Sequence, residues 1–264
     1  MSIRSRFGDT RRFVWSSIHR RSVRFTNREP IVSFTFDDFP RTAYSTGGAI
    51  LEGFGARGTY YAAAGLMNTS NELGEQFCPD DLHALLAKGH ELGSHTFGHV
   101  SCRDVSCSEF RADVEKGRRV LKQLTGLDSE NFSYPFGDVT LKTKRIVGPD
   151  LASARSIFPG FNGNTIDLNL LRANRLYGDV DRCAGAGALI EENVRRRAWL
   201  IFYTHDVRPQ PSEYGCTPEL FEWVVSSAVR SGSRILPVAQ VLAEVGFARG
   251  MTPSAGQEVA QVRS

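Results

Sequence analysis

The chain has 264 residues, of which 41% are hydrophobic and 23% are charged, and its net charge is +3. This length suits one globular domain with short extensions, and a single α/β barrel of this size buries a sizeable core. The small net charge, with no dense Lys/Arg run interleaved with aromatic residues, excludes a protein built to bind nucleic acid.

Residues 1–29 are a basic segment in which only Asp9 and Glu29 oppose the arginines. We expect a basic N-terminal extension that is solvated or makes weak contact with anionic lipid at a membrane surface. The segment lacks the apolar run of a secretory signal, and nowhere do about eighteen apolar residues run together as a transmembrane span requires. We therefore expect a cytoplasmic protein, peripheral at the inner membrane surface at most.

The cysteines agree with that location. There are five of them, an odd number, and no C-x-x-C pair occurs. A disulfide framework is not expected from this pattern, and a reducing compartment fits it better.

Strand-like and helix-like segments alternate from residue 31 to residue 246. The expected elements are a strand over 31–38, a helix over 46–55, a strand over 57–65, a helix over 78–89, a strand over 90–95, a helix over 106–126, strands over 131–137, 151–157 and 170–178, a helix ending over 191–197, a strand over 199–206, a helix over 218–232, and a last strand and helix over 233–246. Repeated strand-then-helix order predicts an α/β fold with a parallel sheet, either a barrel or a doubly wound sheet. The tail over 248–264 has no periodicity, and we expect it to be flexible.

Polar residues follow several of the predicted strands. Asp37 and Asp38 end the first strand, His95 follows a later one, the turn Pro135–Gly137 follows another, and His205 follows the apolar run over 199–204. In a parallel barrel the carboxyl ends of the strands meet at one rim, where active sites form. We expect these groups to share that rim.

This inventory suits metal-assisted amide hydrolysis. His95 and His99 are four residues apart, and on a helical turn both rings would face one way. Two histidines and a carboxylate are a common ligand set for Zn²⁺ and related ions, and they leave positions open for water and substrate. A second carboxylate can act as a base, a separate histidine can protonate the leaving nitrogen, and a turn N–H can hold an oxyanion.

Four motifs in this order carry a family resemblance. FTFDD, SHTFGH, FSYPFG and LIFYTHD resemble the motifs of the polysaccharide deacetylases, which include the family 4 carbohydrate esterases and the nodulation-factor deacetylases. The resemblance implies a catalytic domain over residues 30–247. It also implies the family's fold, a distorted parallel (β/α) barrel with about seven strands.

The resemblance implies a role for each matching residue in the metal site. Asp37 would be the catalytic base, and Asp38, His95 and His99 would hold a divalent metal ion. Zinc is the default expectation, and cobalt, nickel or manganese would also suit such a ligand set.

Other matching residues would contact the substrate or donate a proton. The Phe136 N–H would help hold the oxyanion, and Tyr134 would lie beside it at the substrate. Tyr203 would line the pocket for the acetyl methyl group, and His205 would be the general acid. In the G-H-E run before the metal histidines, His90 is expected to be structural.

The sequence departs from the best-known family pattern in two places. Many members carry an arginine just before the Pro-Tyr-Gly turn that pairs with the base, whereas residues 131–134 here contain none. Arg175 is our candidate replacement, with Arg172 and Arg155 as competitors. The Asp-Trp motif that orients the general acid is also missing, and Asp206 or Asp167 would have to replace it.

The function expected from the resemblance is removal of N-acetyl groups from an N-acetylated sugar or polysaccharide by attack of a metal-bound water. One alternative is a deformylase or another C–N hydrolase that acts on a lipid-linked sugar or a small amide. A second is a non-catalytic carbohydrate-binding relative, against which the retained base Asp37 argues, because binding alone needs no base. The sequence does not identify the sugar, and it gives no expectation about oligomeric state.

Overall fold

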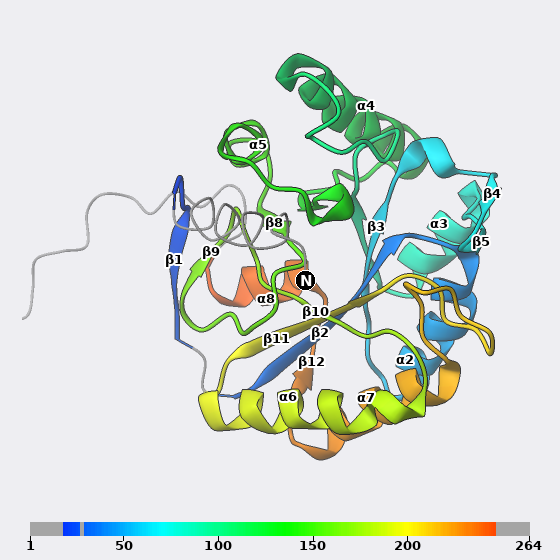
Figure 1. The fold of residues 1–264 in the computed structure, drawn as a ribbon, viewed down its shortest axis with the longest axis vertical. Helices are drawn as coiled ribbons and strands as arrows, with labels where there is room; N and C mark the ends of the chain where they lie inside the picture. Colours follow the sequence, from blue (N-terminus) through cyan, green and yellow to red (C-terminus); the bar gives the residue numbers. More distant parts are fainter. Residues whose placement is uncertain (1–17, 27–28, 247–264) are drawn as a thin grey trace, which may run out of the picture.

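The computed structural model describes residues 18–26 and 29–246, whose path is drawn in Figure 1. Most of the predicted N-terminal extension, and the predicted flexible tail over 248–264, lie outside the described residues.

A curved parallel sheet forms the centre of the fold. Its strands follow the order β10-β11-β2-β3-β6-β7-β8, and β12 joins the same sheet by pairing with β2. Their bounds are β2 (Ile31–Asp38), β3 (Thr59–Ala62), β6 (Glu91–Ser94), β7 (Asn131–Ser133), β8 (Ser153–Arg155), β10 (Asn174–Arg175), β11 (Trp199–Thr204) and β12 (Arg234–Ile235). The sheet curls back on itself, because Arg155 in β8 forms a parallel bridge with Leu171, shortly before β10. The predicted α/β fold, a distorted parallel barrel of about seven strands, is confirmed.

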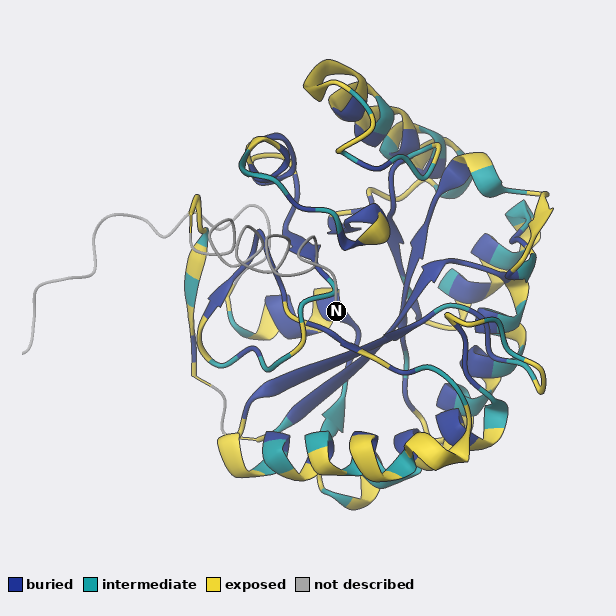
Figure 2. Ribbon diagram, viewed as in Figure 1, coloured by how far each residue is buried: buried dark blue, intermediate teal, exposed yellow. Residues whose placement is uncertain are grey.

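Helices surround this sheet, as Figure 1 shows for α3, α4, α6 and α7. The α-helices are α2 (Ala49–Gly53), α3 (Pro79–Ala87), α4 (Cys107–Thr125), α5 (Leu141–Val147), α6 (Cys183–Arg196), α7 (Pro218–Arg230) and α8 (Val238–Glu244). Shorter turns are the π-helix η1 (Ala43–Gly48) and the 3₁₀ helices η2 (Ala64–Leu66), η3 (Pro135–Gly137) and η4 (Val180–Arg182). Figure 2 shows the central strands buried and the outward faces of these helices exposed.

Burial explains why the two longest strands are nearly continuous apolar runs. All eight residues of β2 and all six of β11 are buried, since helices cover one side of the sheet and the barrel interior fills the other. Aromatic pairs lock the neighbouring strands together: Phe34 stacks on Phe202 with ring centroids 5.8 Å apart, and Phe36 on Tyr60 at 4.5 Å.

Helix α4 begins and ends at clear sequence signals. The Ser106 hydroxyl accepts a hydrogen bond from the Glu109 N–H, and the Glu109 carboxylate accepts one from the Ser106 N–H. Gly126, with φ of 75°, ends the helix in the left-handed conformation that glycine adopts easily. Both ends agree with the predicted helix over 106–126.

One boundary predicted from the sequence is wrong. Strand β1 (Ser22–Phe25) lies inside the segment predicted as an extension, yet it pairs antiparallel with β9 (Asn164–Asp167). Phe25 is buried, and its ring stacks on Trp199 at 6.2 Å. Arg21 donates hydrogen bonds to the carbonyls of Gly148 and Leu151. Arg21 and strand β1 therefore belong to the folded domain, because their hydrogen bonds and packing partners lie in its loops and strands.

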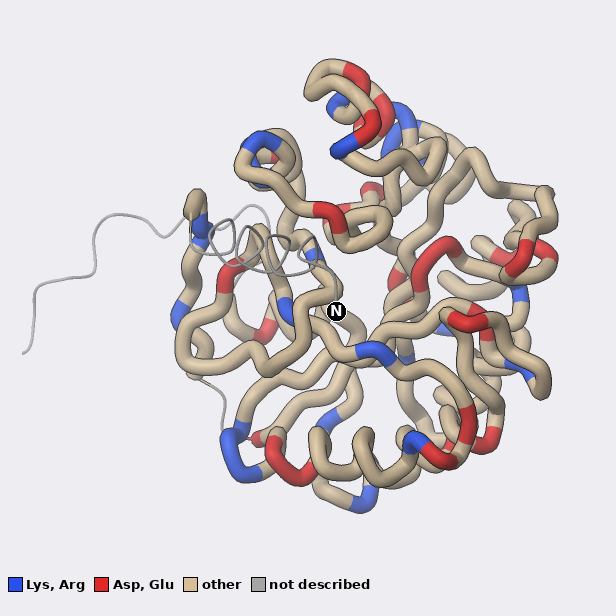
Figure 3. Tube along the Cα trace, in the orientation of Figure 1, with Lys and Arg blue, Asp and Glu red and all other residues tan. Residues whose placement is uncertain are grey.

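Both signs of charge are spread along the described chain, as the blue and red positions of Figure 3 show. Within the described ranges, no helix has both the length and the apolar character needed to cross a bilayer.

Candidate metal centre and active site

The polar groups predicted at the strand ends meet in one cavity of about 360 Å³. It opens where β2, β6 and β11 end and where the turn after β7 follows. Every predicted site residue other than Arg175 lines it, namely Asp37, Asp38, His95, His99, Tyr134, Phe136, Tyr203 and His205.

Three of these residues form a potential metal site. One ligand atom from each of Asp38, His95 and His99 lies within 4.8 Å of the other two. Asp38 Oδ1 is 3.1 Å from His99 Nε2 and 3.4 Å from His95 Nε2, and this buried oxygen has no hydrogen-bond partner. A buried carboxylate oxygen facing two imidazole nitrogens fits a divalent cation, which would compensate the burial of the charge.

The two histidines do not lie on a helical turn, so that part of the sequence interpretation is wrong. Residues 95–100 form an irregular loop in which Thr96 has φ of 63° and His99 has φ of 52°. Asp38 also has a positive φ, of 62°. Left-handed backbone at residues other than glycine costs about 1 kcal/mol or more each and tends to collect at functional sites.

Helix α4 holds this loop in place. The Asp113 carboxylate accepts hydrogen bonds from the N–H groups of Phe97 and Gly98, both at 2.9 Å. Gly117 lets the helix approach closely, because a Cβ there would lie 2.5 Å from the Thr96 carbonyl oxygen. His95 is fixed separately, since its Nδ1 donates to the Ser133 carbonyl at 2.8 Å and leaves Nε2 for the metal.

The charges in the site shift the pKa values of its members. Burial opposes ionisation of Asp38, but the adjacent His95 and His99 outweigh burial and hold its pKa well below the usual range. Burial and the positive charge on His95 lower the pKa of His99 to about 4. Burial also disfavours the charged form of His95, but the Asp38 and Asp37 carboxylates outweigh this effect and raise its pKa.

Asp37 pairs with Arg155 and not with Arg175, which corrects the predicted partner. The Arg155 guanidinium is fully buried, donates to Asp37 Oδ1 and also donates to Ser133 Oγ at 2.5 Å. Its Cζ atom lies 5.2 Å from the centroid of the Tyr61 ring and 5.0 Å from that of the Tyr203 ring.

Strand pairing accounts for the exchange of arginines. Arg155 in β8 pairs in register with Ser133 in β7. The arginine beside Asp37 therefore comes from β8, whereas the best-known family pattern places it just before the turn that follows β7. Arg175 is exposed and lines a different cavity. Burial raises the pKa of Asp37, but Arg155, His95 and His205 together outweigh burial and lower it, so Asp37 is ionised at neutral pH.

His205 is oriented by a backbone carbonyl. Its Nδ1 donates to the Tyr214 carbonyl at 3.1 Å, which leaves Nε2 free to act on substrate. Neither predicted orienting carboxylate contacts it: Asp167 binds Lys144 at 2.8 Å, and Asp206 accepts hydrogen bonds from the N–H and hydroxyl of Ser212. Because the Ser212 hydroxyl also accepts from the Tyr214 N–H, Asp206 acts on His205 only through the loop that carries Tyr214.

The turn after β7 presents Phe136 at the cavity mouth. Phe136 has φ of 58°, and its ring is exposed and packs on His99 at 4.5 Å. Tyr134 contributes only its ring to the cavity wall, because its hydroxyl donates to the Asn169 carbonyl at 3.1 Å. Tyr134, which was predicted to lie at the substrate, therefore presents its ring and not its hydroxyl to the cavity.

The sequence interpretation missed several residues of the site. Tyr61 and Ser133 contact Arg155, and Tyr177 and Tyr214 line the cavity beside His205. The rings of Tyr177 and Tyr203 meet edge to face at 5.5 Å. The available signal was the Tyr-Gly pair in each of the loops after β10 and β11, Tyr177-Gly178 and Tyr214-Gly215.

Comparisons with known proteins agree with this arrangement. Residues 25–148, which include Asp37, Asp38, His95 and His99, match the sequence model described as polysaccharide deacetylase. No curated protein sequence matches the chain.

Solved structures share the fold at low sequence identity. The chitin deacetylase of the fungal pathogen Colletotrichum lindemuthianum has a TM-score of 0.60 at 17% identity, over 88% of this chain and 92% of that one. The Xyl-CE4 domain of a multidomain xylanase from the hindgut metagenome of Trinervitermes trinervoides scores 0.57 at 16% identity, over 86% and 96%. A CE4 family pseudoenzyme scores 0.53 at 14% identity, over 83% and 69%. The ordered motifs, the match over residues 25–148 and the shared fold all make this chain similar to the polysaccharide deacetylases.

Proposed function

We propose that the protein is a metal-dependent hydrolase that removes N-acetyl groups from an N-acetylated sugar or polysaccharide. One observation carries the proposal: a carboxylate with two histidines, a second carboxylate and a third histidine all line the same cavity. The chitin deacetylase that shares this fold gives independent support for the reaction class.

Asp38, His95 and His99 would hold the metal, and the unsatisfied Asp38 Oδ1 is the feature that fits it. When bound, a divalent ion supplies a Lewis acid that lowers the pKa of water toward ~7. Zinc is the default ion, with cobalt, nickel or manganese as candidates, because this donor set is not selective.

The remaining groups move protons and stabilise charge. Asp37, kept ionised by Arg155, accepts a proton from the attacking water. His205 donates a proton from Nε2 to the departing sugar nitrogen, and the Tyr214 carbonyl holds the ring for this task. The Phe136 N–H donates to the oxygen that becomes negative as the acyl carbon turns tetrahedral.

A panel of acylated glycans tests the proposal. Metal-loaded protein should release acetate from an N-acetylglucosamine oligomer, and the His95→Ala and His99→Ala proteins should not. Formyl sugars in the same panel separate a deformylase from a deacetylase. Folded, metal-loaded protein that binds glycans but hydrolyses no member of the panel would instead identify a non-catalytic relative.

We further propose that the protein works in a reducing compartment, the cytoplasm. All five cysteines are free thiols, and Cys216 is buried, where burial raises its pKa to about 12. Fractionation at low and high salt tests this. Recovery in a secreted fraction would contradict it, and loss from membranes at high salt would indicate electrostatic attachment.

A further inference from the structure

A second cavity of about 490 Å³ lies beside the catalytic one. It is formed by β10, the residues that follow β10, the start of α6 and the loop after β11. Tyr177 lines both cavities, and Glu213 lines the second while its neighbour Tyr214 lines the first. The two cavities therefore lie side by side and share Tyr177 as part of their walls.

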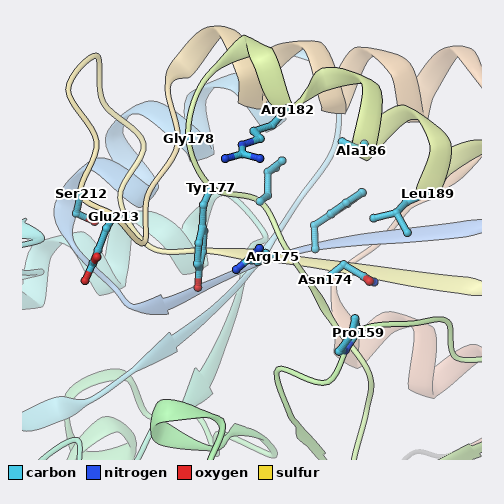
Figure 4. Close-up of a pocket in the computed structure, with 13 residues that line it drawn as sticks. Pro159, Asn174, Arg175, Tyr177, Gly178, Arg182, Ala186, Leu189, Ser212 and Glu213 are labelled. Atoms are coloured by element: carbon cyan, nitrogen blue, oxygen red, sulfur yellow. The ribbon is translucent and has the colours of Figure 1, made fainter. Parts of the chain in front are cut away.

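The second cavity carries an excess of positive charge. Arg175 and Arg182 line it, and Glu213 is the acidic residue among its described lining residues. Figure 4 shows Tyr177 between Glu213 and Arg175, with Arg182 extending from the start of α6 toward Gly178.

The two arginines differ from other arginines of the same region. In the described part of the chain, neither Arg175 nor Arg182 has a carboxylate partner, whereas Arg195 and Arg196 of α6 both pair with Glu192. Glu213 interacts with the Tyr214 hydroxyl. The cavity thus contains two guanidinium groups that are free to bind an anion.

The rest of the wall favours an anion of moderate size. The first turn of α6 has no acidic residue, and the positive end of its dipole adds to the field of the arginines. Gly185 and Ala186 of this turn line the cavity, and a Cβ at Gly185 would meet nothing within 4 Å. A guanidinium group can donate two parallel hydrogen bonds to two oxygens of the same phosphate. Phosphate is therefore the anion that suits a wall with two guanidinium groups.

We propose that this cavity binds a phosphate group carried by the same sugar whose acyl group lies in the catalytic cavity. The proposal rests on the hydrolase function above and names its substrate class, a glycosyl phosphate. The phosphate belongs to a soluble sugar phosphate or to a lipid-linked one, since both present anionic phosphate oxygens to Arg175 and Arg182.

Binding of glucose 1-phosphate, which has the phosphate but no acyl group, tests the site without turnover. Calorimetry should show binding that weakens about tenfold or more in Arg175→Gln and in Arg182→Gln, as expected for lost charge-assisted hydrogen bonds. Gly185→Leu should weaken binding by filling the cavity without a change in charge. Arg195→Gln removes the same charge from the exposed side of α6 and should have no effect. Equal affinity in all five proteins would overturn the proposal, because the phosphate would then bind elsewhere.

Hydrolysis completes the test. The kcat/KM for N-acetylglucosamine 1-phosphate should exceed that for the neutral sugar, and this ratio should fall about tenfold or more in Arg175→Gln and Arg182→Gln. A lipid-linked glycosyl phosphate in detergent is compared with the soluble sugar phosphate, and the one with the higher kcat/KM is the preferred substrate. A neutral oligomer that is hydrolysed as fast as the phosphorylated sugars would overturn the proposal while leaving the hydrolase function intact. Absence of hydrolysis with phosphate binding retained would reject only the hydrolase function.

Discussion

Asp37 and Asp38 are adjacent in the sequence, yet their carboxylates have different partners. Asp37 binds Arg155, whereas Asp38 faces His95 and His99. We therefore expect Asp37→Asn to keep its metal and lose about 10²- to 10⁴-fold in rate, the usual contribution of a general base. Asp38→Asn should lose metal affinity as well. Elemental analysis and kcat measurements of both proteins check this, and the opposite pattern of metal loss would show that the roles are reversed.

Arg155 sets the charge state of Asp37. Without its guanidinium, burial dominates and the pKa of Asp37 rises. Because Asp37 accepts a proton only when ionised, activity is lost as pH falls through this pKa. We expect Arg155→Met to move the acid limb of the kcat/KM profile toward neutral pH, whereas Arg172→Met, at an exposed arginine bound to the Pro159 carbonyl, leaves it in place.

The same pair links stability to pH. The pKa of Asp37 is lower in the folded protein than in the unfolded chain, where it is ~4, so its ionisation stabilises the fold at pH values above ~4. This contribution is lost as the pH falls through the pKa that Asp37 has in the folded protein. Arg155→Met leaves a buried carboxylate uncompensated and should cost about 3–5 kcal/mol of stability. Urea unfolding at neutral pH measures the loss, and a change below about 1 kcal/mol would show that the pair contributes little.

His205 as a general acid predicts a dependence on the leaving group. His205→Ala should cripple hydrolysis of an N-acetyl sugar, whose nitrogen leaves only when protonated, and it should spare an aryl acetate ester, whose leaving group needs no proton. Metal content should not change. An equal loss on both substrates in folded, metal-loaded protein would assign His205 to positioning or oxyanion binding instead.

Among the elements, α4 and the loop over residues 95–100 behave as one unit. Gly117 is the closest point between them, since a Cβ there would meet the Thr96 carbonyl oxygen at 2.5 Å. Gly117→Ala should displace the loop and weaken metal affinity by about 10- to 100-fold, as changes around metal ligands do. Gly53→Ala is the matched control, because a Cβ there meets nothing within 4 Å. Metal titration of the two proteins compares them, and equal affinities would show that the loop tolerates the shift.

Local signals were sufficient to predict the main elements. The mainly apolar run over 31–38 predicted β2 with the bounds that the structure has, because a strand buried on both faces is rich in apolar residues. Ser106 or Ser108 was expected to begin α4 and Gly126 to end it, and the structure has Ser106 and Gly126 there. Strand β1 was missed because its alternating exposed and buried residues resemble a charged tail until β9 is placed beside it. The loop from His95 to His99 was misjudged because Asp113 of α4 binds the N–H groups of Phe97 and Gly98 between its left-handed residues, a contact that the spacing of the histidines does not show.

At the scale of the whole molecule, the site depends on contacts between distant parts of the chain. Motif order predicted that Asp37, His95 and His205 would meet, because each follows a parallel strand and such strands end at one rim. It could not choose among Arg155, Arg172 and Arg175. That choice depends on the pairing of β8 with β7 and on which arginine is buried.

The metal should also stabilise the whole fold. A ligand that binds only the folded state adds about 4 kcal/mol when its concentration is a thousand times its Kd. For a domain of this size, that gain corresponds to a rise in Tm of roughly 8–16 °C. Chelation should therefore lower the Tm of the wild-type protein and have no effect on His95→Ala or His99→Ala. A Tm that does not respond to the metal would contradict the proposed site.

This stabilisation should depend on pH with a definite sign. In the metal-free protein the pKa of His95 is raised, so a proton competes with the metal for its Nε2 at pH values below that raised pKa. Metal affinity should fall about tenfold per pH unit below that pKa and level off above it, and binding should release protons to the buffer. Calorimetry in two buffers of different ionisation enthalpy measures the release at several pH values. Affinity that stays constant through the neutral range would show that His95 is already neutral before the metal binds, and that Asp37 and Asp38 do not hold its proton.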